Sequence, residues 1–184
     1  NNIIFIPLYI NMFTWYKRGG KYFNCPVKVG FKFQKKLIFD KSNFDVEIWK
    51  ERLERLKSQD FNRIKIPEFT YEIIDNEILL EIEFIKGRQL GATTFMYWQH
   101  VIKEDLVDRE DDWGFGDLKP ENFIIEKKTD TLYIVDFDTY DPRDRENKLS
   151  EWNKYLKKSI DEIKSSDIVV THRTGAIINE FWGS

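Results

Sequence analysis

One stretch of the sequence, residues 113–138, limits what this chain can fold into more than any other feature. It contains Trp113-Gly-Phe-Gly-Asp-Leu-Lys-Pro-Glu-Asn-Phe-Ile-Ile125 and then Thr131-Leu-Tyr-Ile-Val-Asp-Phe-Asp138. Turn-forming residues separate apolar runs rich in isoleucine, and this pattern predicts two short strands with loops at their ends. The loops would place four polar residues at one edge: Asp117, Lys119, Asn122 and Asp136.

These four side chains match the needs of phosphoryl transfer from a metal-bound triphosphate. The metal needs hard oxygen ligands, which Asp136 and Asn122 can supply. A second carboxylate must orient the attacking hydroxyl, here Asp117, and a cation must lie near the transferred phosphate, here Lys119. The alternative interpretation of the stretch is a solvated acidic turn beside a hairpin.

The same stretch resembles the protein kinase superfamily. The catalytic loop of that family has the form H-R-D-L-x-x-x-N, and its metal-binding loop has the form D-F-G. This chain has Phe-Gly-Asp-Leu-Lys-Pro-Glu-Asn at residues 115–122 and Asp-Phe-Asp at residues 136–138. Phe115 stands in place of the usual His, and Asp138 in place of the usual Gly. Gly116 and Asp138 are more similar to small-molecule kinases of the aminoglycoside and choline kinase type.

The resemblance implies an α+β, two-lobed protein-kinase-like fold. The N-lobe would be an antiparallel β-sheet with one helix, and the C-lobe would be reduced and mainly helical. ATP and Mg²⁺ are implied as cofactors, with Asp117 and Lys119 in the catalytic roles and Asn122 and Asp136 as metal ligands. The resemblance covers about residues 17–138 and then thins, because no long activation segment and no A-P-E element follow.

Composition and charge restrict the class of protein further. The 184 residues are 41% hydrophobic and 16% aromatic, which is enough for a packed core in one large domain or two small lobes. The net charge of -3 gives no overall basic field, so nucleic acid is not indicated as a partner. The apolar run at residues 3–10 is too short to span a bilayer. Cys25 is the only cysteine, which fits a reducing, cytoplasmic location.

Apolar segments alternate with Gly and Pro in the first 40 residues, and we expect strands at about 3–9, 12–17, 21–33 and 35–39. Gly19 and Gly20 lie between two of these strands. A glycine turn can bring backbone N–H groups close to phosphates, because no Cβ intrudes. The same pair is first of all a hairpin signal, so a plain turn remains an alternative.

A helix is predicted over residues 44–57, where apolar residues recur at helical spacing after a cap at Ser42 or Asn43. The family resemblance makes Lys36 the lysine that holds the α and β phosphates of ATP, and Glu47 the helix glutamate that pairs with it. Other residues compete for these two roles: Lys32, Lys35, Lys41, Glu51 and Glu54.

The segment after the predicted helix resembles the strand and hinge between the lobes of kinases. An adenine ring needs an apolar slot and backbone hydrogen bonds, so we expect Glu83 and Ile85 to contact it through their backbones. The hinge divides the single kinase-like domain into an N-lobe, residues 1–86, and a C-lobe, residues 87–184.

The remaining elements follow from periodicity and turn residues. Strands are predicted at 69–74 and 77–84, joined by a turn at Asp75-Asn76. Helices are predicted at 91–108, 149–163 and 176–181, and loops at the acidic run 108–112 and at 141–147.

The sequence therefore favours an ATP-dependent phosphotransferase that acts on the Ser or Thr hydroxyl of a protein substrate. Lys119, two residues after Asp117, is similar to Ser/Thr protein kinases, and the chain has no length for the inserted helices that form a small-molecule acceptor pocket. Two alternatives stay open. One is a small-molecule kinase of the aminoglycoside or choline kinase type, and the other is a pseudokinase-like binding module without transfer.

Overall fold

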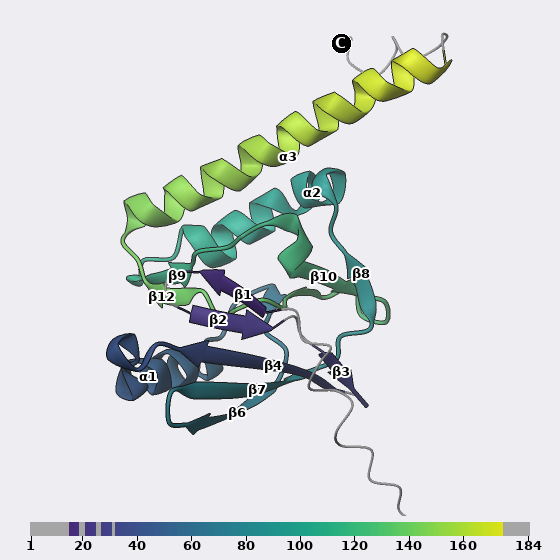
Figure 1. Ribbon diagram of the computed structural model, residues 1–184. Coiled ribbons are helices and arrows are strands. Elements are labelled where there is room, and N and C mark those ends of the chain that lie inside the picture. The colour runs from purple at the N-terminus through teal and green to yellow at the C-terminus, as the bar shows by residue number, and fades with distance from the viewer. Residues whose placement is uncertain (1–14, 19–20, 25–26, 31, 175–184) are drawn as a thin grey trace, which may run out of the picture. The chain divides into compact units, whose positions relative to one another are not determined.

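The chain folds into two compact units. The computed structural model describes residues 15–18, 21–24, 27–30 and 32–174. The first unit consists of Asn1–Ser58 and Pro67–Ile85, and the second of Gln59–Ile66 and Lys86–Ser184. The predicted boundary lay after residue 86, whereas the structure divides the chain after Ile85 and gives residues 59–66 to the second unit. Within the described residues the architecture is mixed α/β, with largely antiparallel sheets and three α-helices (Figure 1).

A six-stranded antiparallel sheet forms most of the first unit. Its order is β1 (Trp15–Arg18), β2 (Lys21–Asn24), β4 (Lys32–Phe39), β7 (Glu77–Glu83) and β6 (Phe69–Ile74), and β3 (Val27–Val29) also pairs with β4. Buried residues alternate with more exposed ones along β7, as expected of a strand with one face on a core. The predicted strand pair with a turn at Asp75-Asn76 is confirmed, and Asp75 takes the left-handed φ of 53° that such a turn needs.

One helix, α1 (Val46–Lys57), packs against this sheet, where the sequence predicts it. Its buried face consists of Trp49, Leu53 and Leu56, which follow the 3.6-residue period. The Trp49 ring lies 4.9 Å from the Phe39 ring on β4. The helix therefore covers the face of β4 on which Phe39 lies.

The predicted cap of α1 was wrong. Asp45 caps the helix, because its Oδ1 accepts hydrogen bonds from the backbone N–H groups of Glu47 at 3.0 Å and Ile48 at 3.2 Å. Ser42 and Asn43 lie one turn earlier, in the 3₁₀-helix η1 (Lys41–Asn43). The chain thus makes a separate short turn before the helix begins.

Two small sheets of short strands lie in the second unit. One has the order β5 (Ile64–Lys65), β11 (Leu132–Ile134), β10 (Phe123–Glu126) and β8 (Gly87–Gln89), and the other pairs β9 (Trp113–Phe115) with β12 (Tyr140–Pro142). β5 runs parallel to β11, and the other pairs are antiparallel. The second unit therefore holds two small sheets beside its helices, and β10 and β11 are the two short strands that the sequence predicts within residues 113–138.

Helices α2 (Ala92–Ile102) and α3 (Arg145–Thr174) pack against each other in the second unit, and Figure 1 shows α3 extending along α2. Phe95 of α2 is fully buried, with its ring 5.6 Å from the Trp152 ring of α3. The end of α2 continues into a π-helical turn, η2 (Lys103–Val107). The loop predicted over 141–147 is much shorter in the structure, because β12 ends at Pro142 and α3 begins at Arg145.

Three predictions concern parts of the chain that lie outside the described residues: the strand at 3–9, the turn at Gly19 and Gly20, and the helix at 176–181. Among the described helices, none combines the length and the apolar character that crossing a membrane requires.

Candidate active site

Strand pairing brings the two polar loops of the second unit next to each other. On one side β9 pairs with β12, with Phe115 opposite Tyr140, and on the other β10 pairs with β11, with Phe123 opposite Ile134. The loops between these pairs are residues 116–122 and 135–139. The Val135 N–H donates to the Asn122 carbonyl at 2.8 Å, and the Gly116 N–H donates to the Thr139 carbonyl at 3.3 Å. Asp117 and Asp136 therefore lie on neighbouring loops that backbone hydrogen bonds hold at both ends.

Asp117 is the most constrained side chain of this site. It is 5% exposed, and each of its carboxylate oxygens accepts a hydrogen bond. Lys119 Nζ donates to Oδ2 at 2.8 Å, and the Tyr155 hydroxyl, on α3, donates to Oδ1 at 2.6 Å. The Asn122 amide nitrogen donates to the Asp117 carbonyl at 2.7 Å and so closes the loop. The structure thus brings together Asp117, Lys119 and Asn122 within one loop.

The electrostatic surroundings keep Asp117 ionised. Burial alone would raise its pKa, but hydrogen bonds from Lys119, Tyr155 and Asn122, together with the positive charge of Lys119, outweigh burial and hold the pKa below its ordinary value. Asp117 is therefore a carboxylate near neutral pH, which is the state that can orient and accept a proton from a hydroxyl.

Asn122 and Asp136 offer oxygen donors that suit a magnesium ion. The Asn122 side chain uses its nitrogen on the Asp117 carbonyl, so its amide oxygen is the atom it can present to a cation. Asp136 follows β11 and is partly exposed. Among the described residues no group of three or more His, Cys, Asp or Glu side chains is arranged to hold a metal ion. The donor set matches the magnesium mode of binding, in which one or two protein ligands act together with phosphate and water.

The surroundings of Gly116 leave no space for a side chain at the position before Asp117. A Cβ at this position would collide with the guanidinium group of Arg143, which packs against the Gly116 backbone. Arg143 also forms an ion pair with Asp141, with 2.6 Å between Nε and Oδ1. The chain therefore has a cation beside the residue before Asp117, but this cation comes from the end of β12.

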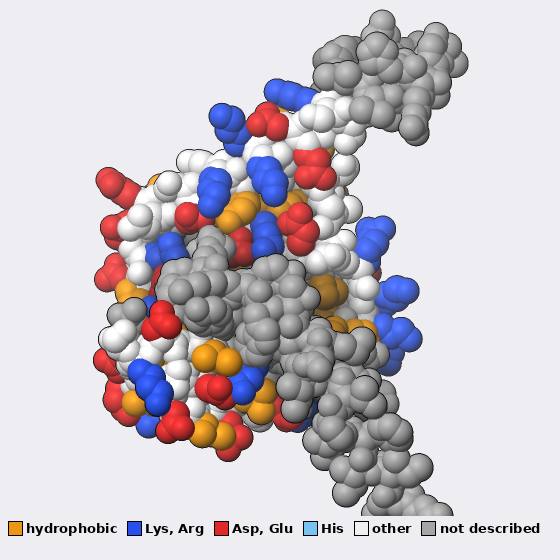
Figure 2. Space-filling model, viewed as in Figure 1, with side chains coloured by type: hydrophobic (Ala, Val, Ile, Leu, Met, Phe, Trp, Pro, Cys, Tyr) orange, Lys and Arg blue, Asp and Glu red, His pale blue; other side chains and the backbone are white. Residues whose placement is uncertain are grey.

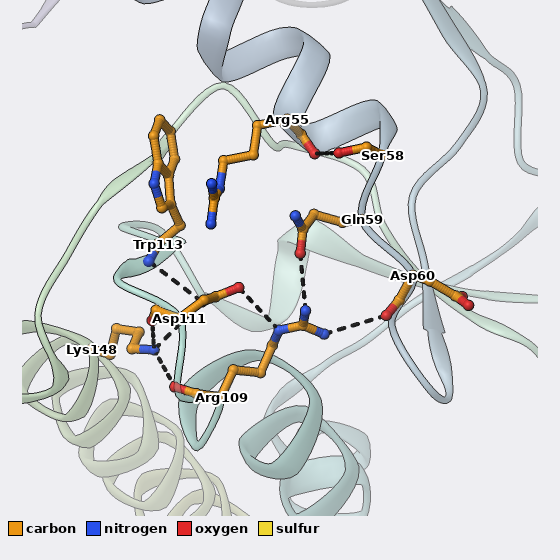
Figure 3. Close-up of polar contacts among 8 residues, drawn as sticks. All are labelled: Arg55, Ser58, Gln59, Asp60, Arg109, Asp111, Trp113 and Lys148. Carbon is orange, nitrogen blue, oxygen red and sulfur yellow. Dashed lines mark hydrogen bonds and ion pairs between the residues drawn. The ribbon is translucent and has the colours of Figure 1, made fainter.

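The polar network in Figure 3 fixes the loop that leads into β9. Lys148 on α3 is buried and donates to the carbonyls of Arg109 at 2.6 Å and Asp111 at 2.8 Å. The Arg109 guanidinium donates to Gln59 Oε1 at 3.0 Å and to the Asp60 carbonyl at 3.3 Å. Residues 108–112 form a loop with exposed acidic side chains at Asp108, Glu110 and Asp112, as the sequence predicts, and two backbone carbonyls of this loop accept from a buried ammonium group.

Lys36, predicted to hold the phosphates of ATP, and Glu47, predicted to pair with it, each form an ion pair with another residue. Lys36 Nζ lies 2.5 Å from Glu77, and Glu47 lies 3.1 Å from Lys50 on the same helix. The Glu47 side chain is 77% exposed, away from the buried face of α1. The hollow beside Lys36 measures about 130 Å³, too small for a nucleotide, and is lined by Lys36, Glu72, Ile74, Glu77 and Leu79.

Lys35 is the buried lysine of β4. It is 5% exposed and shares a face of the strand with Leu37 and Phe39, which are also buried. Neighbouring residues of a strand point to opposite faces, so Lys35 and Lys36 cannot serve the same site. The sequence places both lysines in the strand but does not reveal which of them faces α1.

The predicted hinge contacts lie at the end of the first unit. The Glu83 N–H donates to the Glu68 carbonyl at 2.8 Å, so this donor is already used within the β6–β7 pair. Ile85 is buried, with a side chain that is 4% exposed. Whether either backbone contacts an adenine ring stays a prediction.

Tyr155 is the contributor to the site that sequence reasoning missed. It lies 38 residues from Asp117, on a helix predicted only from its periodicity. That periodicity places residues 148, 152, 155 and 159 on one face, and all four are buried. The pattern could have shown that Tyr155 points inward, but not that it reaches Asp117.

No family model and no curated protein matches this chain. Among solved structures, the high-resolution crystal structure of WbdD matches with a TM-score of 0.46 and 10% identity, covering 79% of this chain and 37% of that one. The co-crystal structure of WbdD and kinase inhibitor LY294002 matches with a TM-score of 0.38 and 11% identity, covering 71% and 33%. The chain thus spans only about a third of the length of these structures.

Proposed function

We propose that the chain is an ATP-dependent phosphotransferase with a small protein-kinase-like fold. The observation that carries the proposal is the construction of the loop 117–122. Asn122 closes this loop on the Asp117 carbonyl while Lys119 pairs with the Asp117 carboxylate, and Val135 ties the loop to the one that bears Asp136. These are residue types that phosphoryl transfer needs, on two loops that a backbone hydrogen bond joins.

Each residue of the loop has a role in this reaction. Asp117 orients the acceptor hydroxyl and takes its proton as the acceptor oxygen bonds to the γ-phosphorus of ATP. The bond from that phosphorus to the bridging oxygen breaks at the same time, and ADP leaves. Lys119, whose side chain is 35% exposed, can turn from Asp117 to the transferring phosphoryl group and balance its charge.

Asn122 and Asp136 would hold Mg²⁺ through their side-chain oxygens. A magnesium ion held there would supply positive charge that neutralises part of the phosphate charge. The hydrogen bond from Asn122 to the Asp117 carbonyl keeps the amide in one orientation, so the same contact serves both the loop and the metal site.

Lys35, and not Lys36, is the lysine that we expect to hold the phosphates of ATP. Lys36 lies in an ion pair at the side of the sheet near a small hollow, whereas Lys35 is buried on the face covered by α1. A buried ammonium costs desolvation energy, and proteins keep such groups where they meet anions. Glu47 is exposed, and we no longer assign it as the partner of this lysine.

The acceptor we favour is a Ser or Thr hydroxyl of a protein. Only residues 139–144 connect the Asp136 loop to α3, so the described second unit has no inserted helices there to enclose a small acceptor. On the face shown in Figure 2, basic and acidic side chains of the described residues are interspersed, which gives a folded protein substrate charges of both signs to contact. The lone Cys25 fits an intracellular setting in which ATP is present. A small-molecule acceptor is the alternative that a substrate panel would identify.

A pseudokinase-like binding module is the second candidate, and two observations favour it. Both oxygens of Asp117 are engaged in a side chain that is 5% exposed. In addition, the glutamates of α1 are exposed, and its buried face consists of Trp49, Leu53 and Leu56. Such a protein would bind nucleotide without transferring phosphate.

Transfer of label from γ-labelled ATP tests the proposal. The protein is incubated with Mg²⁺ and either a generic protein substrate or a panel of aminoglycosides and choline. Asp117→Asn is expected to lower the rate on the order of 1000-fold with the fold unchanged. Asp130→Asn is the matched control, because Asp130 is exposed, lies in the β10–β11 turn and has a left-handed φ of 53° that Asn accepts. Nucleotide binding with no transfer to any acceptor would leave the binding module as the function.

A pair of lysine variants tests the phosphate assignment. Lys35→Met is expected to raise the KM for ATP at least about 10-fold, and Lys36→Met to change it by less than about 2-fold. The reverse order would return the role to Lys36. Circular dichroism and thermal unfolding of both variants show whether the buried substitution has disturbed the sheet.

A further inference from the structure

The Tyr155 hydroxyl contacts the proposed catalytic carboxylate from a different element than the catalytic loop. It lies 2.6 Å from Asp117 Oδ1, while Lys119 Nζ lies 2.8 Å from Oδ2. The shorter distance is typical of a hydroxyl that donates to an ionised carboxylate. Each oxygen of Asp117 therefore has its own donor, one from α3 and one from the loop itself.

The two donors differ in their freedom to move. Tyr155 is 6% exposed, and its hydroxyl reaches from α3 to the catalytic loop. The Lys119 side chain is 35% exposed and extends from a loop. Lys119 can change rotamer at small cost, whereas displacing Tyr155 requires a closely packed interior to rearrange. Oδ1 of Asp117 is thus the fixed oxygen, and Oδ2 is the one that can become accessible.

The buried face of α3 is more polar than packing alone requires. Four residues follow one another on it at helical spacing, and three of them are polar: Lys148, Trp152, Tyr155 and Ser159. An apolar face would bury α3 without the cost of desolvating an ammonium group and hydroxyls. Two of these polar groups, those of Lys148 and Tyr155, therefore have a use other than burial.

That use is visible in their partners. Lys148 holds the carbonyls of Arg109 and Asp111, which precede β9, and Tyr155 holds Asp117, which follows β9. Seven residues of helix, about 10 Å, separate the two contacts on α3. Through these two side chains, α3 contacts the backbone just before β9 and the Asp117 carboxylate just after it.

We propose that Tyr155 is a positioning residue of the phosphotransferase, which fixes Asp117 Oδ1 so that Oδ2 receives the acceptor hydroxyl. The inference rests on the proposed function. When Lys119 turns to the transferring phosphoryl group, Oδ2 accepts the hydrogen bond of the acceptor and then its proton, as the acceptor oxygen bonds to phosphorus and the bridging oxygen leaves with ADP. Tyr155 keeps its own proton throughout.

Kinetics of Tyr155→Phe test this role, because the substitution removes the hydroxyl and keeps the ring. We expect kcat to fall about 10- to 100-fold and the KM for ATP to change less than about 2-fold, since misplacement of the carboxylate affects the chemical step. Ser159→Ala is the matched control. It removes a buried hydroxyl one turn further along the same face, and we expect its kcat to stay within about 2-fold of the unmodified protein.

A double-mutant cycle separates positioning from general damage. In the Asp117→Asn background Tyr155→Phe should cause no further loss of kcat, because the tyrosine acts through that carboxylate. An unchanged kcat in Tyr155→Phe, or the same fold loss in both backgrounds, overturns the inference.

A spectroscopic signature gives a readout that needs no turnover. In the full chain at neutral pH we expect a downfield, slowly exchanging hydroxyl proton in the ¹H NMR spectrum that is absent in Tyr155→Phe and in Asp117→Ala. If this proton is present but no acceptor is phosphorylated, the proposed function fails while the contact stands. If phosphate is transferred and Tyr155→Phe turns over at the unmodified rate, the role of Tyr155 alone is refuted.

Discussion

Gly116 is a single residue whose identity follows from what lies beside it. The Arg143 guanidinium occupies the space that a Cβ would need, so the position next to Asp117 has to be glycine unless the arginine moves. Substitutions at Gly116 should therefore affect stability through Arg143.

Gly116→Ala is expected to lower the free energy of unfolding by about 1 kcal/mol or less, because the added methyl group displaces the Arg143 guanidinium, the far end of a flexible side chain, from its ion pair with Asp141. Arg143→Ala alone is the control, and urea unfolding measures the stability of both variants. The loss should shrink when Arg143→Ala is combined with Gly116→Ala, and an equal loss in both backgrounds would show that the arginine is not the cause.

The Tyr71 hydroxyl gives a pH dependence that can be predicted with its sign. It donates to Glu54 at 2.7 Å, and burial together with this hydrogen bond raises the pKa of Tyr71 to about 12. A raised pKa means that the stabilisation is complete below the ordinary tyrosine pKa of about 10 and is lost as the pH rises toward 12. The urea midpoint of the unmodified protein should therefore exceed that of Tyr71→Phe at pH 8, with a difference that falls between pH 10 and 12. A difference that grows with pH would contradict this.

At the scale of elements, α1 depends on a cap that the sequence did not single out. Asp45→Ala removes the acceptor for the N–H groups of Glu47 and Ile48 and should lower the free energy of unfolding by about 1 kcal/mol. Ser42→Ala, the predicted cap, should change it by less than about 0.5 kcal/mol, because Ser42 is exposed in the preceding turn. Thermal unfolding distinguishes the two, and a larger effect of Ser42→Ala would restore the original prediction.

Strand β5 is held by one buried carboxylate from η2. Asp105 is 1% exposed, and its Oδ2 accepts from the N–H groups of Arg63 at 2.6 Å and Ile64 at 2.8 Å. Asp105→Ala leaves both donors without this acceptor and should lower the free energy of unfolding by about 2–4 kcal/mol. Glu104→Ala removes an exposed ion pair with Arg63 and should cost less than about 1 kcal/mol. Similar losses in the two variants would contradict the role of the buried carboxylate.

The sequence predicted best what is local. Asp117 and Asn122 are five residues apart on one turn, so their meeting was visible in the order of residues, and so was the helix with Trp49 on its buried face. Lys35 could not be separated from Lys36, because the two faces of β4 differ only in what packs on them. Tyr155 could not be placed on Asp117, because that contact depends on how α3 returns across the chain.

At the scale of the whole molecule, the chain passes between its two units three times, after Ser58, after Ile66 and after Ile85. Residues 59–66 thus interrupt the first unit and belong to the second, where β5 pairs with β11. The two parts predicted from the sequence, 1–86 and 87–184, therefore differ from the two compact units, mainly because residues 59–66 lie in the second unit.

Fragments 1–86 and 87–184 are therefore expected to fold poorly when each is expressed alone. The first would expose Phe61 and Ile64, which are buried in the second unit, and the second would lack the strand beside β11. Co-expression should restore a soluble complex, detectable by co-purification and by cooperative thermal unfolding. A cooperative transition of the isolated fragment 87–184 would show that residues 59–66 are dispensable.

The polar face of α3 makes the rotational phase of this helix matter more than its length. One residue inserted between Trp152 and Tyr155 would turn everything after it by about 100° and shift it by about 1.5 Å, while Lys148 stayed on its carbonyls. The tyrosine side chain would then point away from Asp117, even though the helix itself would remain intact. Over these seven positions the chain should tolerate exchanges of side chains on the solvent side and no change in spacing.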